Sequence, residues 1–147
     1  MQGRLLPKVK GRYQAFPGKQ WQSEFKIAKK IGINLIEFIF EENDEIVNPL
    51  INRNSLDQIL EISYDTGVKV RSVCADYFMN NPIYDLENKK NIEILQTLLQ
   101  NCQYIGVNEI VIPFIDNSKI DNIIKKENLI TFFKYFENIL SKTEIKL

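Results

Sequence analysis

The chain of 147 residues contains no histidine and only two cysteines, Cys74 and Cys102. Zinc sites that depend on several histidines are therefore disfavoured. Neither cysteine belongs to a CxxC pair, so a zinc knuckle or a redox motif has no support. Both cysteines fall in segments that read as strand or helix, and we expect them to be buried, reduced thiols.

Excess charge and long apolar runs are also missing. Lys plus Arg equals Asp plus Glu, at 19 each, so no field of one sign attracts nucleic acid or an anionic membrane surface. No apolar run approaches the roughly 20 residues of a membrane span. The first residues lead at once into Pro7 and Lys8, not into the apolar core of a signal peptide. We expect a cytoplasmic protein without a nucleic-acid or membrane partner.

The chain does contain a repeat. Gly32, Gly67 and Gly106 recur at similar intervals, each followed by a β-branched residue and a short apolar segment. Glycine suits the left-handed residue just past a helix end, and a repeat that holds one helix and one strand is a βα unit. The strand segments are nearly unbroken apolar runs, which is typical of parallel strands buried on both faces.

The elements follow from this repeat. We predict strands at 1–6, 35–40, 70–74 and 109–114, and the start of a fifth strand at 144–147. Ser55 and Gln58 fit a capping box, which predicts a helix start there. Apolar residues at helical spacing, which we expect in the core, define four helix faces: Trp21, Phe25, Ala28 and Ile31; Leu56, Ile59 and Leu60; Ile92, Leu95, Leu98, Leu99 and Cys102; Leu129, Phe132, Phe133, Phe136, Ile139 and Leu140.

The connections are unequal in length. Turns before the strands are short, whereas the joints after them are long, at 7–20, 41–54, 76–85 and 115–125. This layout is typical of a (β/α)₈ barrel, and a doubly wound sheet is the alternative. We predict an α/β fold with parallel strands, in which residues 1–147 form one partial domain. It is the N-terminal half of a TIM barrel, with four βα units and the start of strand five, ending before strands five to eight are complete.

The predicted strand ends carry more specific sequence, at 1–5, 14–17, 35–37 with 48–50, 70–79 and 112–118. Together these segments resemble the N-terminal half of sugar phosphate isomerases and epimerases of the xylose-isomerase-like TIM-barrel superfamily. The resemblance implies a sugar or sugar phosphate substrate and one divalent metal (Mn, Mg or Co). Carboxylates would then move a proton through an enediolate. The family's metal ligands, which include a histidine, lie on strands five to eight. We therefore expect no metal site in this chain, and no activity from it alone.

The resemblance suggests substrate-pocket residues at these strand ends. Glu37 either faces the barrel mouth or pairs with Arg4 or Arg71. Arg4 either binds a phosphate or pairs with Glu37. Cys74 and Asp76 correspond to a region that contacts substrate hydroxyl groups. The alternatives are core packing for the thiol and a turn or helix cap for the carboxylate.

Asp116 and Asn117 follow the fourth predicted strand. They either line the pocket or form an ordinary turn, because Asp-Asn-Ser is common turn sequence.

Two other functions compete with the isomerase reading. A half-barrel exposes complementary edges, so a non-catalytic chain that associates with itself, or with a complementing C-terminal half, is the main alternative. An endonuclease IV-like phosphodiesterase shares the barrel but uses several histidines as zinc ligands, and this chain has none. Dinucleotide binding is disfavoured because no GxGxxG motif occurs.

Overall fold

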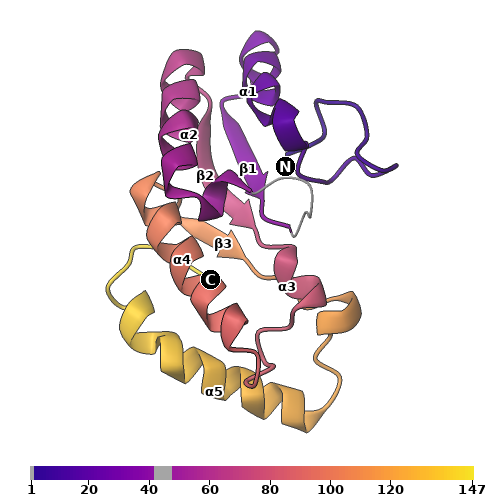
Figure 1. Ribbon diagram of the computed structural model, residues 1–147, viewed down its shortest axis with the longest axis vertical. Coiled ribbons are helices and arrows are strands. Elements are labelled where there is room, and N and C mark those ends of the chain that lie inside the picture. Colours follow the sequence, from indigo (N-terminus) through magenta and orange to yellow (C-terminus); the bar gives the residue numbers. More distant parts are fainter. Residues whose placement is uncertain (1, 42–47) are drawn as a thin grey trace.

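The computed structural model describes residues 2–41 and 48–147 of the chain (Figure 1). Three parallel strands form one sheet in the order β1-β2-β3, with β1 at Leu35–Ile39, β2 at Lys69–Cys74 and β3 at Glu109–Val111. The α-helices are α1 (Trp21–Lys30), α2 (Arg53–Thr66), α3 (Tyr77–Asn80), α4 (Lys89–Tyr104) and α5 (Ile123–Leu140). The prediction of an α/β fold with parallel strands is confirmed. Residues 42–47 of the predicted loop 41–54 lie outside the described residues.

The two faces of the sheet differ in character. On one face, the strand register places Ile36 beside Val70, and Val73 between Phe38 and Ile110. These five side chains are buried in a core that also contains residues of α1, α2, α4 and α5. The apolar helix faces predicted from the sequence contribute to that core, because a helix beside a sheet must bury its apolar stripe. Ile31 and Leu60 were also expected in the core, but they are 55 % and 38 % exposed.

The opposite face carries the polar residues. Glu37 lies beside Ser72, and Ser72 beside Glu109, in one row across the three strands. The next row toward the carboxyl ends contains Cys74, flanked by residues of β1 and β3. The register shifts between Ile36 and Glu37, so a residue of β2 is bypassed and the strand bends there.

Two helix boundaries show how local signals act. α2 begins at Arg53, two residues before the predicted start at Ser55. The Asn52 side chain provides the cap, because its oxygen accepts a hydrogen bond from the Asn54 N–H at 3.1 Å. Gly67 ends the helix with φ of 75°, the left-handed conformation that was predicted for it.

The predicted first strand is not formed in residues 2–6, and Met1 lies outside the described residues. Gly3 has φ of 84°, which breaks an extended segment, and the Glu24 carboxylate binds the backbone N–H groups of Gly3 (2.9 Å) and Leu5 (3.1 Å). Of residues 2–6, Gln2 is the one that forms hydrogen bonds with the edge of the sheet, at β1. Its N–H donates to the Glu37 carbonyl at 2.8 Å, and its side-chain oxygen accepts from Ile39 N–H at 3.0 Å.

The predicted fifth strand is present only as a single bridge. Lys146 forms a parallel bridge with Glu109 at the outer edge of β3. Its carbonyl accepts from Ile110 N–H at 2.9 Å, and its own N–H donates to the Asn108 carbonyl at 2.8 Å. The chain therefore meets both edges of the sheet, near Gln2 at β1 and near Lys146 at β3 (Figure 1). In the described part of the chain, no helix is long and apolar enough to span a bilayer.

Candidate polar site at the strand ends

The carboxyl ends of the strands are tied together by backbone hydrogen bonds. Phe40 N–H donates to the Cys74 carbonyl at 2.9 Å, and Ala75 N–H donates to the Val111 carbonyl at 2.8 Å. Tyr77 N–H then returns to the Phe40 carbonyl at 2.9 Å. These bonds fix the first residues after β1 and β2 relative to one another. Side chains directly after the two strands are therefore attached to a backbone that is fixed by hydrogen bonds.

Cys74 and Asp76 form a contacting pair. The Cys74 thiol donates to Asp76 Oδ1 at 3.0 Å. Burial raises the pKa of the Cys74 thiol well above its ordinary value, and the hydrogen bond to Asp76 and the charges of Asp76 and Glu37 raise it further. The thiol is therefore protonated at neutral pH and unsuited to act as a nucleophile. Asp76 precedes α3 but its side chain makes no capping bond to it, so its carboxylate is used for the thiol instead.

Glu37 does not pair with either arginine, as far as the described residues show. Arg4 is exposed and donates to Gln14 Oε1 at 3.5 Å, within its own loop. Arg71 donates to the Gly106 carbonyl at 2.7 Å, toward the amino end of the sheet. Of the two alternatives for Glu37, the pairing with Arg4 or Arg71 is the one that the structure does not form, and two local features account for this. The Gly3 turn directs the segment around Arg4 outward, and Arg71 is the residue that the register shift bypasses.

The two candidates after β3 lie on a short 3₁₀ helix, η3 (Asp116–Ser118), and both are exposed. Asp116 has φ of 51°, as is common for aspartate in turns. Asn117 Nδ2 donates to Asn80 Oδ1 at the end of α3, at 3.2 Å, and its carbonyl accepts from the Tyr84 hydroxyl at 3.2 Å. These contacts dock the loop onto α3, and they do not bring Asn117 to the Cys74–Asp76 pair.

Glu41 is a residue that the sequence reasoning missed. Its Oε1 accepts from Phe16 N–H at 3.0 Å, and its Oε2 accepts from Arg12 Nη2 at 3.1 Å. Its side chain is 11 % exposed, against 56 % for Arg12. Ile39 pairs with Cys74 in the register, so Glu41 and Asp76 both lie two residues beyond a matched pair of strand ends. The acidic residues at the same offset after β1 and β2 become recognisable as a pair once the register of these strands is known.

Glu41 and Asp76 open onto one small polar pocket of about 170 Å³. The remaining lining residues are mostly polar or hydrogen-bonding: Arg12, Tyr77, Met79, Asn80 and Asn81. Two carboxylates face one guanidinium here, and amide groups can both donate and accept. Such a lining suits a ligand with several hydroxyl groups better than a free anion, because the charged residues are negative in sum.

The described residues do not fit a catalytic metal. Within residues 2–41 and 48–147, no three side chains of His, Cys, Asp or Glu come close enough to hold a metal ion. The divalent metal implied by the family resemblance therefore has no set of donors here, and we derive no chemical step through it.

Comparison with known proteins finds a partial similarity to curated sugar-phosphate epimerases. No family model matches the chain. Over 94 residues, or 61 % of the chain, it is 26 % identical to L-ribulose-5-phosphate 3-epimerase UlaE of Escherichia coli strain SMS-3-5, and equally to UlaE of Shigella boydii serotype 18. Each match covers 33 % of the relative, so the chain spans about a third of the length of the curated relatives it matches.

Proposed function

We propose that the chain forms part of a (β/α)₈ barrel of the sugar-phosphate isomerase/epimerase type and supplies part of its substrate pocket. The order of segments across the sheet supports the barrel. Gln2 meets the outer edge of β1, and Lys146 pairs with the outer edge of β3, so all five segments lie in sequence order. A doubly wound sheet reverses its strand order at a switch point, and no reversal occurs among these segments.

One observation carries the functional proposal. Glu41 and Asp76 occupy the same offset after β1 and β2 and share one polar pocket, at the end of the sheet where barrel enzymes bind substrate. In this proposal the carboxylates accept hydrogen bonds from sugar hydroxyl groups, while Arg12 and Asn80 donate to them. Cys74 keeps Asp76 oriented through its S–H bond. The sugar phosphate enters with its hydroxyl-bearing carbons in this pocket.

The proton transfer itself is not assigned to these residues. Epimerisation at a carbon beside a carbonyl needs a base and a group that polarises the carbonyl, and the described residues offer no metal site for the second task. We propose that turnover needs barrel strands other than the three described here. The cytoplasmic location expected from the sequence stays a prediction.

A titration followed by amide NMR tests the proposal. L-Ribulose 5-phosphate at millimolar concentration is expected to shift the resonances of residues 40–41 and 74–81. Asp76→Asn removes one carboxylate with little change of shape and is expected to weaken the effect several-fold. The matched control is Asp65→Asn, an exposed site at the end of α2. Shifts confined to other surfaces, or equal responses of the two variants, would exclude this pocket.

A second candidate function is association without catalysis. Two apolar side chains on the face away from the core remain open, with Leu35 55 % and Val111 46 % exposed. Among the described residues, Lys146 alone bridges the outer edge of β3. A second copy or a separate chain that covered this face would bury both residues. Light scattering distinguishes this function, since a dimer that dissociates on Val111→Glu supports it and a monomer over the whole concentration range does not.

A further inference from the structure

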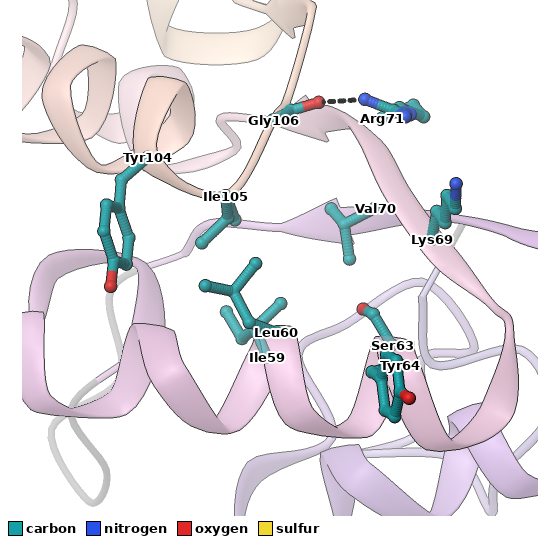
Figure 2. Close-up of a pocket in the computed structure, with 10 residues that line it drawn as sticks. All are labelled: Ile59, Leu60, Ser63, Tyr64, Lys69, Val70, Arg71, Tyr104, Ile105 and Gly106. Carbon is teal, nitrogen blue, oxygen red and sulfur yellow. Dashed lines mark hydrogen bonds between the residues drawn. The ribbon is translucent and has the colours of Figure 1, made fainter.

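A groove of about 370 Å³ lies at the opposite end of the sheet from the polar pocket. It is bounded by α2, by the amino-terminal part of β2 and by the turn from α4 into β3 (Figure 2). β2 runs from Lys69, at this groove, to Cys74, beside the polar pocket. The groove is therefore separate from the candidate substrate site, and its volume falls within the ordinary range for small-molecule pockets.

The floor of the groove is apolar. Ile59, Val70 and Ile105 are 9 % exposed or less, while Leu60 is 38 % exposed and open to a ligand. Figure 2 shows Leu60 and Val70 pointing toward one another, with Ile105 beside them. Two tyrosines, Tyr104 and Tyr64, extend this surface, and they are 44 % and 90 % exposed. A flat apolar group placed between them would remove several partly exposed side chains from water.

The charge at the groove has one sign. Lys69 and Arg71 are the charged residues of the lining, and no carboxylate belongs to it. The Arg71 guanidinium is held in place by a 2.7 Å bond to the Gly106 carbonyl, which leaves its other N–H groups without a carboxylate partner in the described structure. Figure 2 shows the Lys69 ammonium directed away from the floor and Arg71 beside Gly106, so both charges lie at the edge of the groove.

One acidic residue contacts the opposite end of the groove, through Tyr104. The Asp57 carboxylate accepts a hydrogen bond from the Tyr104 hydroxyl at 2.8 Å. The Arg53 guanidinium lies over the same tyrosine ring, 4.1 Å from its centre. Arg53 thus offsets the charge of Asp57 at that end. Within residues 2–41 and 48–147, no ion pair compensates Lys69 or Arg71 at the other end.

We propose that this groove binds a small organic anion with a flat apolar body. The body lies on the floor formed by Leu60, Val70 and Ile105, and the anionic group contacts Arg71 and Lys69. An inorganic anion would leave the apolar floor exposed, and a neutral apolar molecule would leave both cations unused. The site is distinct from the polar pocket, and the two can be tested separately.

The test compares two fluorescent probes that share an apolar body. 8-Anilinonaphthalene-1-sulfonate carries an anionic group, and N-phenyl-1-naphthylamine does not. We expect the anionic probe to bind the wild-type chain more tightly. The double variant Lys69→Gln with Arg71→Gln is expected to weaken its binding by roughly tenfold, because charge-assisted contacts are lost, and to leave the neutral probe unchanged. Lys134→Gln, on exposed α5 surface, is the matched control.

A third variant locates the probes. Ser63→Trp places a bulky ring in the groove and is expected to abolish binding of both probes, with circular dichroism confirming that the fold is retained. Unchanged binding to this variant would place the probes on another surface and overturn the proposal. Equal weakening of both probes by the double variant would also overturn it.

Discussion

The Glu24 carboxylate is expected to control how the amino-terminal segment is attached to the sheet. Glu24 is 1 % exposed in α1, and its two oxygens accept the N–H groups of Gly3 and Leu5. Those bonds hold Gln2 where its N–H reaches the β1 edge at 2.8 Å. Glu24→Ala leaves two backbone donors without an acceptor, at about 1–3 kcal/mol each. Because the segment can partly move into water, we expect a net loss of about 2–4 kcal/mol.

Urea unfolding at pH 7 measures this loss, and hydrogen exchange shows where it arises. Glu24→Gln keeps one acceptor oxygen and is expected to lose about half as much stability, while Glu61→Ala, an exposed site on α2, should stay within about 0.5 kcal/mol of wild type. The Gly3 and Leu5 amides should exchange faster in Glu24→Ala. If those amides stay protected, or if Glu24→Ala unfolds at the wild-type midpoint, the carboxylate does not anchor this segment.

Three further predictions concern the core and the turns. Gly3→Ala should cost more than about 2 kcal/mol, because its Cβ would clash with the Ala15 carbonyl oxygen. Gly67→Ala meets no atom within 4 Å and should cost only the left-handed strain of about 1 kcal/mol. Thermal unfolding measures both. Phe136→Ala should lower the free energy of unfolding, measured in urea, by about 3–5 kcal/mol, because its ring is fully buried. Tyr135 is 60 % exposed, and Tyr135→Ala should lower it by less than about 1 kcal/mol. Similar losses for the two variants would show that α5 is not packed as described. Burial raises the pKa of Cys102 from 9.0 to about 12, so the folded state holds this proton more tightly, and the resulting stabilisation is complete below pH 9 and lost as the pH rises toward 12. Cys102→Ala should lack that part of the alkaline destabilisation, and an unchanged pH profile would contradict the assignment.

The candidate site was only partly predictable from sequence. Cys74 and Asp76 were candidates because the family resemblance implies substrate contacts in that region, and the structure joins them by a hydrogen bond. Whether they contact substrate stays a prediction. Glu41 was missed although it has the same offset after its strand as Asp76, since the offset becomes visible only when the register of β1 and β2 is known. Register depends on pairing between distant segments, which local sequence does not specify.

By itself, the sequence determined the α/β class, the parallel strands and the apolar faces of the helices. These follow from hydrophobic periodicity and from glycine at positions such as Gly67, where short-range sterics dominate. Tertiary structure decided the rest. It turned residues 2–6 out of the expected strand through the bonds of Gly3 to Glu24, and it sent Arg71 to the Gly106 carbonyl instead of to Glu37. Each outcome depended on which hydrogen-bond partner lay within reach after folding, and that distance is absent from the linear sequence.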